Sequence, residues 1–434
     1  MLNADASLVD IAHDLRRDRR RVTRYVGELL DRAEAIEPVL RCLLPEASRR
    51  ERLLSEAGEL TRRYPSDSIR PALYGVPVGV TDMIFVEGLP TRCGSALPPE
   101  VFDAPESSLV TALRARGALV FGKTTVDEFA WAEPTATRNP VNVEHTPGGA
   151  SAGAAAGVAA GLFPLAVGVQ TNRSIIGPAA FTGVAGYKPT HGRVPTDGMV
   201  YCAPSLDVVG LFAQDAAGLL HAASLVVPDW TPSPPSDLPR LAVPDGAYLD
   251  PVSGEPRRVF DAQLESLRWA GYEIEYELFP SREDLAEHYR LAGDLLHGEM
   301  ARVHGAWFRD WASLYRPGTV RAIEKGWDVK EEGLVRARDG REALRDEIQG
   351  LMDRAAIDFM ICPSSNGPAP RGDRPTGYGA MTTLWSYAGM PCVGLPGATT
   401  EAGLPLGLQL VGRHGKDEAL LECARFIHRK LLVR

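Results

Sequence analysis

The amino-acid sequence predicts an α/β fold, and three observations support this prediction. From Gly75 onward, short β-like runs such as VPVGV, ALVFG and PLAVGV alternate with helical runs, which is typical of βαβ units around a largely parallel sheet. The 434 residues include 44% hydrophobic and 24% charged residues, close to ordinary globular usage. No internal repeat or low-complexity tract interrupts the chain. A chain of this length allows two or three domains or one large α/β domain, and we expect one domain over residues 1–434.

The first elements are helices, which we expect over residues 5–60. Apolar residues recur there at helical spacing, namely Leu8, Ile11, Ala12 and Leu15, and then Val26, Leu29, Leu30 and Ala33. The core of the fold is expected over residues 70–226, with a helix at 107–116. Between Gly148 and Gly186 the chain is rich in Gly and Ala, which allows backbones to approach closely. The proline-dense stretch 227–240 is the best candidate for a linker.

The C-terminal part, residues 241–434, returns to mixed elements. Residues 281–357 are mainly helical and charged, and they carry no motif that identifies a substrate. The other predicted elements are strands at 241–244, 358–362, 392–395 and 406–411 and helices at 256–270 and 418–432.

Composition excludes several functional classes. The chain has 47 basic and 56 acidic residues, a formal net charge of −9, which argues against a nucleic-acid or anionic-membrane partner. The six cysteines lie far apart without CxxC spacing, so reduced thiols are expected rather than a metal site. No apolar run reaches the ~18–20 residues that span a bilayer, and the first residues lack the order of a signal peptide. We expect a cytoplasmic protein with a small-molecule substrate and no cofactor or metal, and pairing of the N-terminal helices into a homodimer stays open.

Three blocks of sequence, taken together and in order, resemble the amidase signature family of Ser–Ser–Lys hydrolases, to which the glutamyl-tRNA amidotransferases are related through their A chain. The first block is Gly75–Ser95, GVPVGVTDMIFVEGLPTRCGS, followed by GKTTVDEFAW at Gly122–Trp131. The second is Arg138–Gly198, followed by PSLDVVG at Pro204–Gly210, and the third is Met381–Gly412. The resemblance covers most of the chain. It implies a central mixed β-sheet with helices on both faces.

The resemblance also implies a mechanism. In the family a serine attacks the amide carbonyl, a second serine held by a cis peptide relays the proton to an unprotonated lysine, and backbone amides stabilise the oxyanion. Here the lysine position holds Thr81, whose hydroxyl cannot act as a base near neutral pH. The relay position holds Ala150, Ser151 occupies the next serine's place, and Ser174 keeps the nucleophile position. We expect the cis bond between Gly149 and Ala152 to survive.

The loop before the nucleophile departs further from the family pattern GxDTGGSIRxPA. The aspartate is replaced by Gln170, the two glycines by Asn172 and Arg173, and the arginine after Ser-Ile by Ile176. These changes place two side chains where backbone amides would line the oxyanion hole. Losing one oxyanion donor already lowers the rate about 10²–10³-fold. The sequence therefore predicts that the hydrolytic triad is dismantled.

The candidate site residues each have an alternative. Arg173 brings a donor fork that suits a carboxylate or enolate-like oxygen, or else it points outward or pairs with an acid. His145 or His191 could supply a substitute base, although a lone histidine is more often structural. We expect Ser174, Arg173 and Ser151 to carry any remaining catalysis. The expected binding residues are Gln170, Thr171, Asn172, Cys202 and His145, with Cys202 alternatively a buried inert thiol and Asp82, Asp207 and Asp358 serving structure.

Three functions remain open from the sequence. The first, which we favour, is non-hydrolytic chemistry such as cyclisation, condensation or rearrangement of a small carbonyl- or amide-containing metabolite. The second is an altered amide hydrolase that uses Ser174 with a new base. The third is a catalytically inactive binding or scaffold protein. Intact glycines around the cleft and the arginine in the oxyanion loop favour a reshaped pocket.

Overall fold

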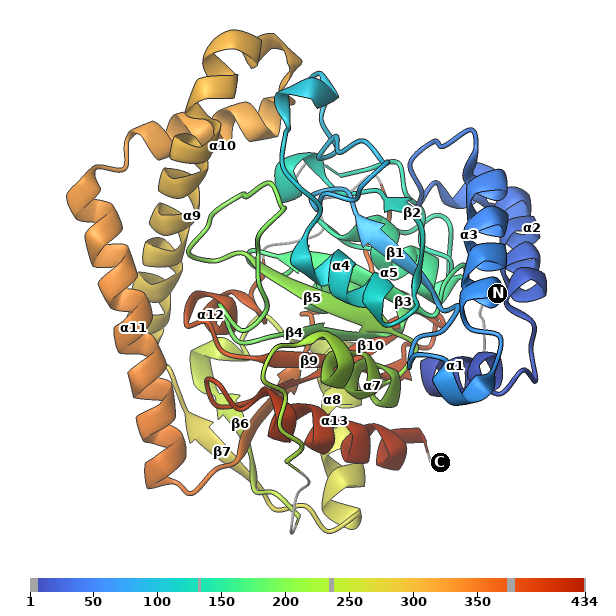
Figure 1. Ribbon diagram of the computed structural model, residues 1–434. Helices are drawn as coiled ribbons and strands as arrows, with labels where there is room; N and C mark the ends of the chain where they lie inside the picture. The colour runs from blue at the N-terminus through green and yellow to red at the C-terminus, as the bar shows by residue number, and fades with distance from the viewer. Residues whose placement is uncertain (1–6, 132–133, 234–237, 373–378, 433–434) are drawn as a thin grey trace.

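The computed structural model describes residues 7–131, 134–233, 238–372 and 379–432. Within these ranges a ten-stranded sheet has the strand order β2-β1-β3-β5-β4-β9-β10-β8-β6-β7 (Figure 1). In chain order the strands are β1 (Pro77–Thr81), β2 (Leu119–Thr124), β3 (Leu165–Gln170), β4 (Ala185–Lys188), β5 (Val208–Ala213), β6 (Leu241–Asp245), β7 (Ile274–Leu278), β8 (Phe359–Pro363), β9 (Cys392–Thr399) and β10 (Pro405–Val411).

The sheet is mixed, as the family resemblance implied. The outer strands β2, β1 and β3 are parallel, and so are β8, β6 and β7 at the other end. From β3 through β5, β4, β9 and β10 to β8, neighbouring strands are antiparallel. The largely parallel sheet predicted from strand–helix alternation is therefore wrong for the centre. The physical reason is connectivity, because strands such as β9 and β10 are joined by a short turn at 400–404 that permits only antiparallel pairing.

Helices cover both faces of the sheet. The helices α4 (Ser108–Ala115), α7 (Ala216–Val226), α8 (Gly254–Trp269) and α13 (Asp417–Leu432) lie over one face. On the other face, α5 (Ala152–Ala159) packs beside α6 (Ile176–Thr182), with α12 (Thr383–Tyr387) nearby. Every residue of α5 is buried, and its small Gly and Ala residues allow this close packing. At Gly157, for example, a Cβ would overlap the ring of Phe163. The predicted linker 227–240 leads from α7 into β6 of the same sheet, and its residues 234–237 lie outside the described residues.

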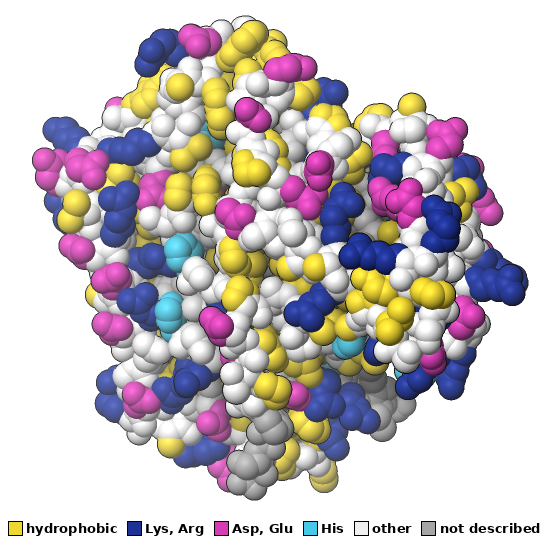
Figure 2. Space-filling model, in the orientation of Figure 1, with side chains coloured by type: hydrophobic (Ala, Val, Ile, Leu, Met, Phe, Trp, Pro, Cys, Tyr) yellow, Lys and Arg dark blue, Asp and Glu magenta, His cyan; other side chains and the backbone are white. Residues whose placement is uncertain are grey.

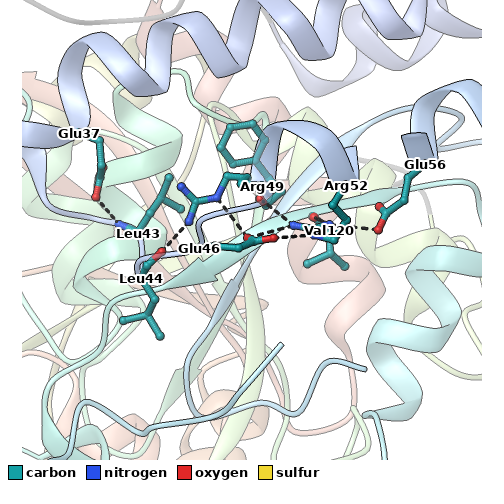
Figure 3. Close-up of polar contacts among 9 residues, drawn as sticks. Glu37, Leu43, Leu44, Glu46, Arg49, Arg52, Glu56 and Val120 are labelled. Atoms are coloured by element: carbon teal, nitrogen blue, oxygen red, sulfur yellow. Dashed lines mark hydrogen bonds and ion pairs between the residues drawn. The ribbon is translucent and has the colours of Figure 1, made fainter. Parts of the chain in front are cut away.

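The N-terminal helices form a layer beside the edge strand β2 (Figure 1, right). They are α1 (Leu8–Arg16), α2 (Val22–Leu40) and α3 (Arg49–Arg63), and residues 5 and 6 of the predicted helical region lie outside the described residues. Figure 3 shows the polar contacts that attach this layer. The Arg52 guanidinium donates to the carbonyls of Val120 and Phe121 at 2.9 and 3.4 Å, and Glu46 holds it from the other side at 2.6 Å.

A second helical layer stands at the opposite side of the molecule (Figure 1, left). It consists of α9 (Arg282–Trp311), α10 (Pro317–Trp327) and α11 (Glu331–Arg354). The buried Glu128 ties this layer to the core, because its carboxylate accepts from the Arg316 amide at 2.9 Å and from the Thr319 hydroxyl at 2.5 Å. The Trp131 indole donates to the Gly318 carbonyl at 3.3 Å. The segment 127–131 therefore joins the helical layer to the cleft.

The surface carries charges of both signs. On the face shown in Figure 2, basic and acidic side chains are interspersed rather than gathered into one basic field. In the described part of the chain, no helix has both the length and the apolar composition needed to cross a membrane.

Candidate active site

The candidate site lies where three parallel strands end. The strands β2, β1 and β3 end at Thr124, Thr81 and Gln170, and parallel strands bring their carboxyl ends to one edge. Val80 of β1 pairs with Val167 of β3, and Thr81 and Gly168 are the next residues of the two strands. The Ser151 hydroxyl lies 3.1 Å from the point where a Cβ on Gly168 would stand. The Ser151 amide donates to the Ser174 carbonyl at 3.4 Å. Ser151 and the Ser174 backbone are therefore in contact at this edge, where Thr81 ends the neighbouring strand β1.

The lysine position contributes only hydroxyls. Thr81 and Thr124 are direct partners on β1 and β2, both are fully buried, and neither hydroxyl has a hydrogen-bond partner among the described residues. The buried Lys123 does not replace the missing base, because its ammonium pairs with Asp82 at 2.9 Å and donates to the Thr91 hydroxyl at 2.8 Å. Burial raises the pKa of Asp82 and the Lys123 charge opposes this shift.

The position that the resemblance assigns to the relay serine holds Ala150, which has no hydroxyl. The Gly149–Ala150 bond is cis, as expected, and the Ala150 carbonyl accepts from the Asp127 amide at 3.1 Å. A Cβ on Gly149 would overlap the Asp127 carboxylate, so any side chain there would require this carboxylate to move. The Ser151 hydroxyl donates to the Val169 carbonyl at 2.9 Å and accepts from the Val169 amide at 3.0 Å. This geometry gives Ser151 a structural bond to β3 in place of a contact with the Ser174 hydroxyl.

The loop that carries Ser174 is held by the side chain that replaces the family's aspartate. The Gln170 oxygen accepts from the amides of Ile175 and Ile176 at 2.8 and 3.0 Å. Its amide nitrogen donates to the Ser386 hydroxyl at 2.9 Å and to the Asn172 carbonyl at 3.2 Å. The Ser386 hydroxyl in turn donates to the Asn172 carbonyl at 2.6 Å. A buried, connected network of this kind fixes the loop in one shape.

The next residue of the loop is bound to a buried carboxylate. The Thr171 hydroxyl donates to Asp207 at 2.6 Å, and the amides of Cys202 and Ala203 donate to the second carboxylate oxygen at 2.7 and 2.9 Å. Burial raises the pKa of Asp207 to about 7, although these donors oppose the shift. Burial also raises the pKa of the Cys202 thiol well above its ordinary value, so the thiol stays protonated and unreactive.

Arg173 borders a cavity on the side of the loop that faces β8. The cavity has a volume of about 20 Å³ and its polar lining includes Ser364, Ser365, Asn366 and Thr382. Arg173 is partly buried, and burial lowers its pKa while the Asp127 charge opposes the shift. A second cavity of about 30 Å³ touches the other side of the loop at Thr171 and Asn172, where its apolar lining includes Trp131, Leu206, Leu296 and Tyr387. Ser174 itself is 5% exposed.

The two histidines considered as substitute bases are held elsewhere. The His145 ring bonds the Ala369 carbonyl at 2.7 Å, and its backbone forms an isolated bridge with Arg371. The His191 ring bonds the Pro204 carbonyl at 3.1 Å, and burial together with Arg341 lowers its pKa to about 4. Within the described ranges, neither ring has a hydrogen bond to the loop 170–176. This arrangement supports structural roles for both.

Several residues of the site escaped sequence reasoning. Asp127, Ser386 and Ser364 lie within or beside motifs that the sequence presented, but no spacing pattern linked them to Gln170 or Arg173. The Gln170–Ser386 contact joins segments more than two hundred residues apart, and Asp127 acts on Arg173 from a different motif. Across the described residues, no group of three or more His, Cys, Asp or Glu side chains is arranged to hold a metal ion.

Comparisons with known proteins show the family and the fold of this chain. The sequence model of the family described as Amidase matches residues 24–421. A glutamyl-tRNA(Gln) amidotransferase chain of Thermus thermophilus is 33% identical over 468 residues, covering 95% of this chain and 96% of that protein. A crystal structure of an amidase superposes with a TM-score of 0.88 at 29% identity, covering 98% of this chain and all of that one. The native peptide amidase of Stenotrophomonas maltophilia, 24% identical, shares the fold with a TM-score of 0.85 and covers 99% of this chain and 98% of that one.

Proposed function

Because this chain belongs to the amidase family, we propose that it is an enzyme that uses the family's cleft for non-hydrolytic chemistry on a small carbonyl- or amide-containing metabolite. Cyclisation, condensation and rearrangement are the reaction classes in question. The observation that carries the proposal is the Gln170 network, which holds the loop of Arg173 and Ser174 in a defined shape although Thr81 and Ala150 supply no base. A vestigial cleft gains nothing from such a connected loop beyond folding.

The proposed chemistry is electrostatic. The Arg173 guanidinium would bind the oxygen on which negative charge develops, since its planar donor fork matches a polarised or anionic oxygen. The Ser174 hydroxyl would donate a hydrogen bond to the same substrate and form no covalent bond to it. A serine without an adjacent base is a poor nucleophile. Rate enhancement would then come from positioning two reacting groups of the bound metabolite.

The first test asks whether Ser174 is a nucleophile. We expect no stoichiometric labelling of the native protein by a fluorophosphonate at neutral pH, under conditions in which an active family member is fully labelled. Intact-protein mass spectrometry measures the labelled fraction, with Ser174→Ala as the control. Stoichiometric labelling that Ser174→Ala abolishes would establish covalent catalysis and overturn the proposal.

The second test identifies the reaction class by mass balance. The protein is incubated with a metabolite extract, and mass spectrometry follows compounds that change only when it is present. Hydrolysis adds one water to the substrate, cyclisation or condensation removes one water from a carbonyl compound or one ammonia or amine from an amide, and rearrangement leaves the mass unchanged. We expect cyclisation, condensation or rearrangement, and no hydrolysis. Arg173→Lys should lower the conversion rate nearly as much as Arg173→Ala, because lysine lacks the planar donor fork, and Ser174→Ala should lower it less than either. If no compound changes when the protein is present, the scaffold alternative is supported. A conversion that none of the three variants alters would show that Arg173 and Ser174 do not carry it.

A further inference from the structure

One of the residues that line the cavity beside Arg173, Ser364, has a buried hydroxyl that the protein does not use. Ser364 follows the last residue of β8 and is 2% exposed, and its hydroxyl has no hydrogen-bond partner in the part of the chain that the structure describes. Space is kept beside this hydroxyl by two glycines of the neighbouring strands. A Cβ on Gly407 would stand 3.0 Å from it and a Cβ on Gly394 would stand 3.7 Å from it. Burying a hydroxyl without a partner is unfavourable for folding. Because Ser364 also lines a cavity together with Arg173, its unpaired hydroxyl points to a partner outside the chain.

The charge of the cavity lining indicates the chemistry of that partner. Arg173 is the charged residue among the described residues that line the cavity, and the rest of the polar lining consists of hydroxyl and amide side chains. A volume of about 20 Å³ has room for one or two water-sized groups, which matches the two oxygens of a carboxylate. A guanidinium carries five donors in a planar fork, so it can bind a carboxylate in addition to its contacts within the protein.

We propose that this cavity is a carboxylate-binding subsite, in which Arg173 and Ser364 donate hydrogen bonds to a carboxylate of the substrate. The substrate class is then a small carboxylic acid that also bears the reacting carbonyl or amide. The inference rests on the proposed function in that the cleft binds a small metabolite, and it requires that Arg173 use separate donors of its fork for the carboxylate and for the reacting oxygen. It assigns Ser364 as a specificity-determining residue, next to the loop that presents Ser174.

The negative charge of Asp127 near Arg173 should also affect the affinity of the cavity for carboxylates. The Asp127 carboxylate lies against Gly149, accepts from the Thr135 amide at 3.2 Å and interacts electrostatically with Arg173. This negative charge opposes the binding of a second carboxylate near Arg173. Asp127→Asn keeps an oxygen that can accept from Thr135 and removes the charge. The variant should therefore bind carboxylates more tightly, whereas the loss of Arg173 or Ser364 should weaken binding.

The experiment compares carboxylates with neutral molecules of the same shape. Propionate and benzoate are titrated against propionamide and benzamide by ligand-observed NMR on the full-length protein. We expect a preference for the carboxylates of about tenfold or more, lost in Arg173→Gln. Ser364→Ala should weaken carboxylate binding about two- to tenfold without lowering the melting temperature, because the hydroxyl has no partner to lose. Ser365→Ala is the matched control, since that hydroxyl donates to the Gly367 carbonyl at 2.7 Å.

The outcomes separate this inference from the proposed function. Equal affinity for carboxylates and amides, or equal effects of Ser364→Ala and Ser365→Ala on carboxylate affinity, overturns the subsite. Weaker carboxylate binding in Asp127→Asn also overturns it. Fluorophosphonate labelling of Ser174 is measured on the same preparations. Full labelling together with selective, Ser364-dependent carboxylate binding would refute the non-covalent mechanism and leave the subsite standing.

Discussion

The two sides of the cleft differ in how their polar atoms are used. On the side of β1 and β2, the hydroxyls of Thr81 and Thr124 are buried without partners among the described residues. On the side of β3, Gln170 is hydrogen-bonded through both ends of its amide and connects the loop to Ser386. One side leaves buried hydroxyls without partners among the described residues, whereas the other is joined by a connected hydrogen-bond network. Side-chain hydrogen bonds therefore fix the loop after β3 and do not fix the ends of β1 and β2 in the same way.

The largest effect should come from restoring both sides together. We expect the double variant Thr81→Lys, Ala150→Ser to stay unlabelled by a fluorophosphonate, because Asn172 and Arg173 still occupy the oxyanion loop. Adding Asn172→Gly and Arg173→Gly should raise the labelling rate of Ser174 by about 10³-fold or more, since a base and oxyanion donors each contribute at least two orders of magnitude.

The control for this restoration is Ser174→Ala in the fourfold variant, with circular dichroism to confirm folding. Labelling of the double variant alone would show that the base side is the sole obstacle. Asn172 and Arg173 would then not prevent the reaction of Ser174, contrary to this prediction.

The second effect concerns the contribution of the Gln170 hydrogen bonds to the free energy of unfolding. Gln170→Ala should lower the free energy of unfolding by about 2–4 kcal/mol, because it leaves the buried amides of Ile175 and Ile176 without an acceptor. Urea denaturation followed by tryptophan fluorescence measures the change. A loss below about 0.5 kcal/mol, typical of an ordinary surface substitution, would show that the loop network is incidental.

The third effect depends on pH through Asp207. Its pKa is about 7 in the folded protein and 3.8 ordinarily, so its contribution to the free energy of unfolding falls as the pH rises between these values. The Thr171 hydroxyl lowers this pKa, so Thr171→Val should raise it and extend the decline to higher pH. We expect the variant to lose about 1 kcal/mol near about pH 5 and about 1.5–3 kcal/mol near about pH 8, where the lost hydrogen bond is to a charged group. Urea denaturation at both pH values tests this, and an equal loss at both would place the carboxylate in one protonation state throughout.

The smallest effect belongs to the unused hydroxyls. Thr81→Val removes a buried hydroxyl that makes no hydrogen bond in the described structure, so the free energy of unfolding should change by less than about 0.5 kcal/mol or rise by up to about 1 kcal/mol. The matched variant Thr91→Val removes an acceptor of the buried Lys123 ammonium and should cost about 1.5–3 kcal/mol. Equal losses in the two variants would mean that Thr81 contributes a bond comparable with that of Thr91.

Sequence reasoning recovered what depends on local pattern and failed where distant segments meet. The strands β1, β2 and β3 could be predicted because each is a short apolar run between turn residues. By contrast, β4 is four residues long and begins Ala-Gly, so its strand conformation depends on pairing with β5 and β9 on its two sides.

The same limit applies to the site. The positions of Thr81, Ala150 and Ser174 followed from the family resemblance, and the register of β1 with β3 brings them to one edge. The role of the Ser151 hydroxyl could not be predicted, because its partner is the backbone of Val169 on another element. Backbone groups are the same in every sequence. No residue type in the sequence therefore indicated that the Ser151 hydroxyl would hydrogen-bond to the backbone of β3.

The contacts around Arg52 have a consequence for how the chain avoids aggregation. An edge strand with free backbone groups is a template on which a second molecule can add a strand. Here Arg52 occupies the carbonyls of Val120 and Phe121, and the segment 42–44 bonds to Lys123 and Thr125 farther along. Without these contacts the backbone groups of β2 would form an uncovered edge. The N-terminal helices and the segment 42–44 therefore cover the edge at which a second molecule could add a strand.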